Sequence, residues 1–310
     1  MERFTIDNRS NASSIAVRQS LRYYTTVAII AIVAMMCVSS MCRAQSLTVR
    51  TPAFAQPLVE QWAALYNASH AADEQVAVAG RNQEADIQIT VSRHQAEQLG
   101  QTTTVFGRYA ILPFVTAGSE AARTFGNKHL SKSRLEHIYF ALDDEDDEFG
   151  DYADAAKGMS VYSGNSQASV ANSFAEFFGQ EAAAFRGKRI QGDDRFVNVA
   201  VSRDAKALSF NALSNLYDLT SRNLRDNIQL LGLDVSRRLQ SALEDNDLDA
   251  VLNALEQEQD DDVAIANISL SYDATNPQTV AFISWVLTEG VKYNHQFGLL
   301  NAPEALQAVK

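Results

Sequence analysis

The chain is poor in cysteine, in basic clusters and in long apolar runs, and each shortage excludes a class of protein. Only two of its 310 residues are cysteines, Cys37 and Cys42, so no network of disulfides is available to hold the fold. Acids outnumber lysines and arginines by 38 to 26, which gives a formal net charge of -12. The basic residues form no cluster that would attract a phosphate backbone, so we do not expect nucleic acid as a partner.

Metal-ligand spacing is also missing. The five histidines show no paired ligand spacing, and we expect neither a metal site nor a cofactor. The acids of Asp245–Asp249 together with Glu256 match the oxygen spacing of a calcium-binding EF-hand loop, but Ala250 replaces its central glycine. We interpret this stretch as a helix with an acidic N-cap.

The N-terminal 44 residues have the order of a secretory signal. Arg18 and Arg22 precede the apolar run Val27–Val38, and small residues follow up to Ala44. The run is shorter than the ~20 apolar residues that a spanning helix needs. The sequence therefore predicts an exported, periplasmic protein cleaved after Ala44; lipidation at Cys42 is the less favoured alternative, because no small residue stands directly before it.

The next segment alternates short strands with a helix. The patterns predict strands at Ser46–Arg50, Gln75–Ala79 and Asp86–Val91, and a helix at Leu58–Asn67 opened by Pro57. Strands separated by helices are typical of a parallel sheet in an α/β lobe.

The middle of the chain predicts a second set of elements. We expect strands at Gly107–Val115, Ser160–Tyr162, Phe196–Val201, Ala207–Asn211 and Ala264–Leu270, and helices at Leu130–Phe140, at Val170–Gly179 and within Ser236–Gln259, the last broken near Asp245–Asp247. The acid-rich stretch Asp143–Asp154 reads as a solvated loop, because such dense carboxylates repel one another unless water surrounds them.

The C-terminal stretch Pro277–Lys310 carries the most specific pattern. Apolar Val280, Ile283, Val286 and Leu287 recur at helical spacing after Pro277. The order Phe282-x-x-Trp285-x-Leu287-Thr288-Glu289-Gly290-x-x-Tyr293, then Phe297-Gly298-Leu299 and Ala302-Pro303-Glu304, resembles the C-terminal signature of the phosphate-binding proteins of ABC transporters. Phe54, Pro57 and Trp62 are similar to a second motif of that family.

The resemblance implies a fold and a division of the chain. It implies the α/β, two-lobed type II periplasmic-binding-protein fold, with two mixed sheets flanked by helices and joined by crossing strands. Residues 45–112 and 264–310 would form the first lobe and residues 113–263 the second. We expect the C-terminal helix to pack on the first lobe, away from the cleft.

The resemblance also implies three ligand-contacting segments. The first is the loop before the first helix, with Ala53 and Phe54; the second is the strand-to-helix junction, with Ser163, Ser166, Gln167 and Ser169; the third is Asp86–Arg93, with Thr90 and Ser92. Ala53, Val91 and Ser163 stand where the family carries Thr, Asp and, in one of two registers, Arg. Arg50, Arg81 and Arg108, at strand ends, are candidates to restore the charge, and Arg81 is the one we assign to the site.

The resulting function hypothesis is non-enzymatic. A small anion, phosphate or another, would enter the interlobe cleft, and an ABC permease and ATPase would receive it if transport is retained. One alternative is a binding-protein-like domain that has lost transport and acts as a structural or sensory partner. A third hypothesis is a serine hydrolase, because Gly164–Ala168 nearly fits Gly-x-Ser-x-Gly, with Ser166 as nucleophile and Asp273 and His295 following in order.

Overall fold

The computed structural model describes residues 46–71, 74–80, 83–92, 101–126, 128–140, 156–165, 169–257 and 262–303. The predicted signal region, the acidic loop at Asp143–Asp154 and the residues Arg81, Ser166 and Gln167 lie outside them. None of the helices in these ranges is long and apolar enough to cross a bilayer.

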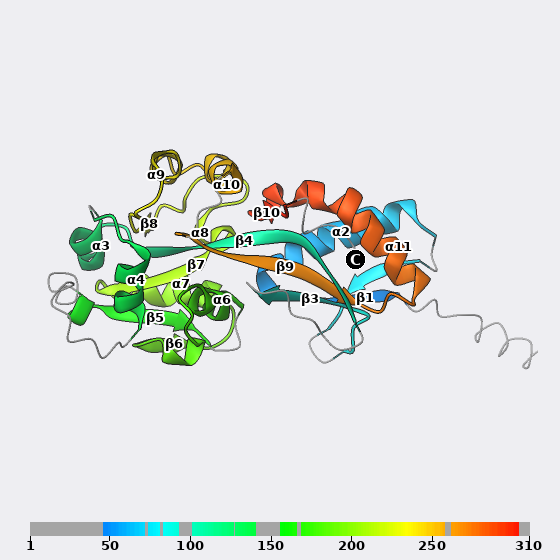
Figure 1. Ribbon diagram of the computed structural model, residues 1–310, viewed down its shortest axis with the longest axis horizontal. Helices are drawn as coiled ribbons and strands as arrows, with labels where there is room; N and C mark the ends of the chain where they lie inside the picture. Colours follow the sequence, from blue (N-terminus) through cyan, green and yellow to red (C-terminus); the bar gives the residue numbers. More distant parts are fainter. Residues whose placement is uncertain are drawn as a thin grey trace, which may run out of the picture. The chain divides into compact units, whose positions relative to one another are not determined.

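The fold alternates strands and helices along the chain (Figure 1). In chain order the strands are β1 Leu47–Arg50, β2 Val76–Val78, β3 Ile87–Ser92, β4 Thr102–Thr116, β5 Ser160–Gly164, β6 Lys188–Ile190, β7 Ala207–Ala212, β8 Ile228–Leu230, β9 Ala264–Tyr272 and β10 Leu300–Asn301. The helices are α2 Gln56–Ser69, α3 Glu120–Phe125, α4 Lys132–Tyr139, α6 Ser169–Phe177, α7 Arg195–Val201, α8 Leu213–Leu216, α9 Arg237–Glu244, α10 Leu248–Gln257 and α11 Pro277–Thr288. Four 3-10 turns are η1 Ala53–Ala55, η3 Ala182–Ala184, η4 Gly290–Tyr293 and η5 His295–Phe297.

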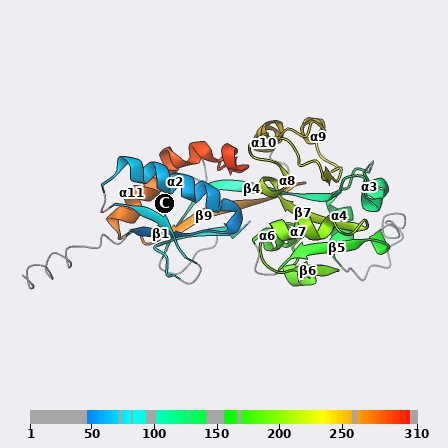
Figure 2. The same cartoon turned by 180° about the vertical axis from the view of Figure 1, so that it is seen from behind.

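Two long strands tie the molecule together. The strand order is β2-β1-β3-β9-β4-β7-β5-β6, with β8 and β10 paired to β4 outside this path. β4 pairs with β9 up to Ile111, where it begins to pair with β7. Figures 1 and 2 show β4 and β9 running between two groups of elements, one around β1–β3 and the other around β5–β7. The fold is therefore two-lobed, with β1–β3, α2 and α11 in the first lobe and β5–β8, α3, α4 and α6–α10 in the second.

The parallel pairing predicted for the first lobe is confirmed. β1 pairs in parallel with β2 on one side and β3 on the other. β9 returns antiparallel beside β3, so the sheet is mixed. Parallel neighbours end at the same edge, which places the loop after β1 and the end of β3 close together.

The helix α11, which carries the C-terminal signature and is called the signature helix below, packs on the first lobe, as predicted. Its Asn276 side chain caps the first turn and Pro277 occupies it, as that position favours. Phe282 and Trp285 both contact the ring of Tyr66 on α2 edge-on. One predicted member of the apolar face is wrong: Val280 is 41% exposed, and Phe282 is the buried residue instead.

One predicted strand is wrong as a whole. Phe196–Val201 lies in the helix α7, where Val197 and Val201 are buried one turn apart and Phe196 is exposed. The carboxylate of Asp193 accepts the backbone N–H of Arg195 at 2.9 Å, which satisfies a donor at the helix start. This six-residue run, with five apolar residues and the single polar Asn198, fits either period, and the hydrogen bond at the helix start favours the helix.

The predicted break within Ser236–Gln259 is confirmed. α9 ends at Glu244 and α10 begins at Leu248, with Asn246 between them at a φ of 57°. Asp247 accepts the backbone N–H of Asp249 at 2.9 Å. The carboxylates of this segment thus serve the start of a helix, which agrees with the capping interpretation.

Candidate functional site

The loop that follows β1 brings an uncapped helix start to a hollow between the lobes. After Arg50 the chain makes the turn η1 and enters α2 with Pro57 in its first turn. No side chain caps α2 and no acid lies in its first turn, so the positive end of its dipole is not neutralised there. Phe54 is held by stacking on Tyr109 of β4, with 4.8 Å between the ring centres.

The hollow has a volume of about 680 Å³ and walls from both lobes. This volume falls within the ~300–1,000 Å³ typical of ligand sites. The first lobe contributes Ala53, Phe54, Gln56, Pro57 and Glu60, and the second contributes Asp193, Arg195, Asn198, Ser214, Asn215, Leu219 and Arg225.

Two arginines supply the positive charge of this hollow. Nε and Nη2 of Arg195 donate to the two carboxylate oxygens of Asp193, at 3.1 and 2.8 Å. This pairing lowers the pKa of Asp193, chiefly through the hydrogen bond from Arg195, and keeps it ionised. Arg225 lies 3.8 Å from the carboxylate of Asp218, beyond hydrogen-bonding distance.

A network of three asparagines, of which Asn211 and Asn215 are buried, joins the elements around Arg195. The amide of Asn211 donates to the Asp194 carbonyl at 2.9 Å and to the side-chain oxygen of Asn198 at 2.8 Å. Its oxygen accepts from Asn215 at 2.9 Å. Burial, with a smaller contribution from neighbouring Asp193, raises the pKa of the Asp194 carboxyl to about 7. The network therefore joins the start of α7 to β7 and α8.

The structure places the predicted site residues differently from one another. Ala53 and Phe54 line the hollow. Ser163 is fully buried in β5, and its hydroxyl has no hydrogen-bond partner among the described residues. Thr90 pairs with Ser269 of β9 and is partly exposed.

For the remaining predicted residues the structure gives less. Ser92 ends β3 and Ser169 begins α6, and α6 packs against β3, so their backbones belong to neighbouring elements. Arg81, Ser166 and Gln167 lie outside the described residues. The predicted ligand roles of all nine residues stay predictions.

Two of the three cations proposed from strand ends, Arg50 and Arg108, are engaged elsewhere. Arg50 donates to the carbonyl of Gln83, and Arg108 donates through Nε to the carbonyl of Asn301 at 3.2 Å. Neither lines the interlobe hollow. Arg195 and Arg225, which do line it, were not predicted from the sequence. A signal for Arg195 was present, because the consecutive acids Asp193 and Asp194 before an apolar run indicate a helix start with Arg195 in its first turn.

Asp273 and His295, two of the residues suggested for a hydrolase, each have another hydrogen-bond partner. The Nε2–H of His295 donates to the carboxylate of Glu256 at 2.8 Å. Asp273 instead accepts the hydroxyl and the backbone N–H of Thr275, at 2.7 and 2.8 Å. Glu256 thus stands where that hypothesis placed Asp273, and Ser166 lies outside the described residues.

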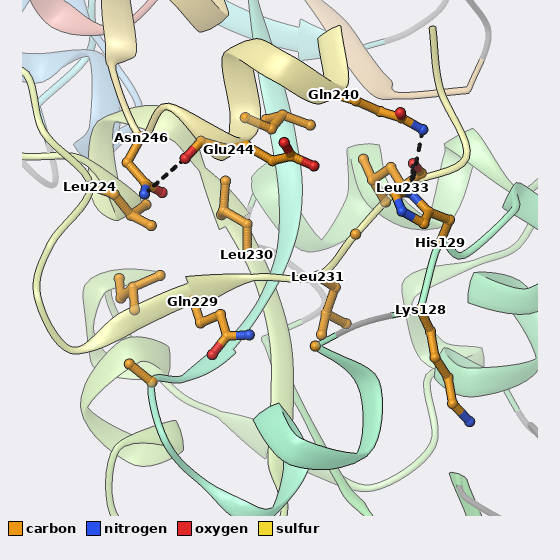
Figure 3. Close-up of a pocket in the computed structure, with 15 residues that line it drawn as sticks. Lys128, His129, Leu224, Gln229, Leu230, Leu231, Leu233, Gln240, Glu244 and Asn246 are labelled. Atoms are coloured by element: carbon orange, nitrogen blue, oxygen red, sulfur yellow. Dashed lines mark hydrogen bonds between the residues drawn. The ribbon is translucent and has the colours of Figure 1, made fainter. Parts of the chain in front are cut away.

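A second hollow, of about 610 Å³, lies within the second lobe (Figure 3). Leucines such as Leu230 and Leu231 line it, and Nδ1 of His129 lies 3.3 Å from the amide of Gln240 at its rim. None of the predicted site residues lines this hollow. Its polar groups do not converge with a helix start or with paired arginines, so we place the candidate site between the lobes.

Comparison with known proteins identifies the fold. No protein-family model and no curated protein matches the sequence. Among solved structures, an ABC-type phosphate transport receptor from Vibrio cholerae matches with 14% identity and a TM-score of 0.55, over 83% of this chain and 100% of the receptor. A putative phosphate ABC transporter substrate-binding protein from Clostridium perfringens, solved with bound phosphate, matches with 12% identity and a TM-score of 0.53, over 84% of this chain and 100% of that protein. The chain therefore has the two-lobed type II fold of the periplasmic phosphate-binding proteins, which confirms the fold predicted from the C-terminal signature.

Proposed function

We propose that the protein is an exported solute-binding protein that captures a small anion between its lobes, without catalysing a reaction. The observation that carries this proposal is the hollow that joins the uncapped start of α2 to Arg195 and Arg225. Helix amides and guanidinium groups are the donors that proteins use to bind oxyanions. Delivery to an ABC permease and ATPase, and the lobe boundaries near residues 112 and 263, belong to the same proposal.

The pairing of Arg195 leaves room for a ligand. Asp193 occupies Nε and one N–H of Nη2, and a guanidinium group has five N–H donors. The two N–H groups of Nη1 and one of Nη2 therefore remain for a second acceptor. Asp193 orients Arg195 in this arrangement, and the ligand binds at the other edge of the guanidinium group.

A titration of the purified protein tests the proposal. Phosphate, sulfate and small organic anions are added one at a time, and the melting temperature and the heat of binding are followed. A ligand at a hundred times its Kd stabilises a protein by about 2.7 kcal/mol, which a melting curve readily shows. Absence of stabilisation and of binding heat with every anion would contradict a solute-binding role.

A second candidate function has support from residues on both walls of the hollow. Ala53 brings no hydroxyl, and Arg195 already carries a carboxylate partner, so the site is weaker in donors than the resemblance implies. A domain that has lost its solute and serves as a structural or sensory partner fits these features. Failure of the anion titration, together with co-purification of one protein in stoichiometric amount from the exported fraction, would favour this function.

A further inference from the structure

Three of the five residues that the first lobe gives to the hollow are apolar. Ala53, Phe54 and Pro57 line it at the start of α2. The other two, Gln56 and Glu60, form a hydrogen bond with each other, in which Gln56 donates to the carboxylate of Glu60 at 2.7 Å. Among the side chains of this wall only Gln56 has N–H donors, and the neighbouring carboxylate of Glu60 would repel an inorganic oxyanion placed there. The wall is suited to a carbon skeleton.

The facing wall holds the free donors. Arg195 keeps one edge of its guanidinium group open beside the Asp193 pair, and its side chain is 73% exposed. Arg225 is held only at 3.8 Å by Asp218, whose carboxylate already accepts the backbone N–H groups of Thr220 and Ser221. Leu219, beside these donors, continues the apolar surface.

The charge balance of the hollow favours a singly charged ligand. Its charged residues are Glu60, Asp193, Arg195 and Arg225, two negative and two positive. A dianion would meet two carboxylates and no excess of positive charge, and the chain as a whole carries a net charge of -12. A monoanion needs one open guanidinium edge, which Arg195 and Arg225 each supply.

We propose that the ligand of the interlobe hollow is an organic monocarboxylate with an apolar body, its carboxylate on Arg195 and Arg225 and its body against Phe54, Pro57 and Leu219. This inference rests on the proposed solute-binding function and names the class of solute. It differs from inorganic phosphate in having an apolar body, which needs an apolar wall.

The test measures dissociation constants by calorimetry for three members of the proposed class and for three comparison compounds. Benzoate, phenylacetate and 3-methylbutanoate represent the class; acetate lacks the apolar body; benzamide lacks the charge; inorganic phosphate is the polar alternative. We expect the apolar carboxylates to bind more tightly than acetate and benzamide by about tenfold or more, and phosphate to bind weakest.

Single substitutions test whether the ligand contacts the proposed residues. Arg195→Gln and Arg225→Gln each remove one charged donor set and should weaken binding of the apolar carboxylates about tenfold to a hundredfold. Leu219→Asn should reduce the ratio between the dissociation constants of acetate and benzoate, because it removes part of the apolar surface. Arg238→Gln, on the exposed face of α9, is the matched control and should leave binding unchanged. Circular dichroism and the melting temperature verify that each variant is folded.

Each outcome decides between the two proposals. Binding of phosphate without binding of the carboxylates overturns the monocarboxylate proposal and leaves the solute-binding function standing. Binding of none of the probes, in folded protein, overturns the monocarboxylate proposal, and the wider anion titration then decides the function. Carboxylate binding that neither arginine substitution weakens shows that the ligand lies elsewhere and also overturns the proposal.

Discussion

The packing around the signature helix and the interlobe hollow show two different uses of side chains. Beside the helix, Trp62 is fully buried, and its indole N–H donates to the carbonyl of Gly290 at 2.8 Å. The ring of Phe106 contacts Trp62 edge-on, with 4.9 Å between ring centres. In the hollow, Arg195 and Arg225 retain donors that no described residue satisfies fully.

The difference explains why the fold is recognisable and the ligand is not. Residues packed from several sides cannot change without a cavity or a clash, so their order carries information about the fold. Residues exposed around an open hollow, such as Ala53, can change with little cost to stability. If this is correct, substitutions at densely packed residues should lower stability, and substitutions around the hollow should alter binding with little effect on stability.

Trp62→Ala should have the largest effect on stability. The side chain is fully buried between Phe106 and η4, and its loss leaves a cavity and an unpaired carbonyl at Gly290. We expect a loss of about 3–5 kcal/mol in the free energy of unfolding, measured in urea. Val280→Ala, on the exposed side of α11, is the control and should change it by less than about 0.5 kcal/mol. An equal effect of both variants would contradict the dense packing of this region.

Asn211→Ala tests the asparagine network next to the hollow. We expect its loss to lower stability, as expected for the packing around the signature helix. Asn211 is fully buried and links Asp194, Asn198 and Asn215 by hydrogen bonds. Its removal leaves buried groups unpaired, at about 1–3 kcal/mol in total. Arg195→Gln, above it at the surface, should cost less than about 1 kcal/mol. Urea unfolding of both variants measures the contrast, and a greater loss from Arg195→Gln would reverse it.

Gly290→Ala should cost about 1–3 kcal/mol through overpacking. A Cβ atom there would lie 3.0 Å from the indole nitrogen of Trp62, in the turn that accepts its hydrogen bond. Gly80→Ala is the matched control, because a Cβ there meets only the Gln83 side chain at 3.8 Å. Thermal unfolding of both variants makes the comparison; equal melting temperatures would show that η4 adjusts freely.

Local patterns predicted most of the frame. The strands β1 to β3, the crossing strand β4 and the helix α11 follow from hydrophobic periodicity and from prolines at helix starts, which act within a few residues. Phe196–Val201 failed because its pattern is short enough for both periods, and a single cap at Asp193 decides it.

The candidate site could be predicted only in part. Ala53 and Phe54 were found through a sequence motif, whereas the asparagines of the network come from three separate elements and share no motif. Arg225 reaches the hollow from a loop whose course is set by tertiary packing. The pair of Glu256 and His295 was missed for the same reason, since 39 residues separate its members.

The Glu256–His295 pair gives the smallest effect, and it depends on pH. The hydrogen bond to Glu256 raises the pKa of His295 more than burial lowers it. Burial raises the pKa of Glu256, but the hydrogen bonds from His295 and from the backbone of Asn301 outweigh it and lower the pKa overall. The contribution of His295 is fully present below its unfolded pKa of about 6.5 and is lost as the pH rises through the raised folded value. That of Glu256 is present above about pH 4.3 and is lost as the pH falls through its lowered value.

A double-mutant cycle with His295→Gln and Glu256→Gln isolates this pair from other titrating groups, among them Asp194, whose raised pKa also makes stability fall as the pH increases from the acid range. The coupling energy, from urea unfolding, should be about 0.5–1 kcal/mol at pH 6 and smaller at pH 9, because the pair is charged only at the lower pH. Asp249 and Arg222 also face His295 and have opposite charges, so their effects partly cancel. A coupling energy that is equal at pH 6 and pH 9 would show a neutral hydrogen bond, and α10 would then be held to the C-terminal segment without an ion pair.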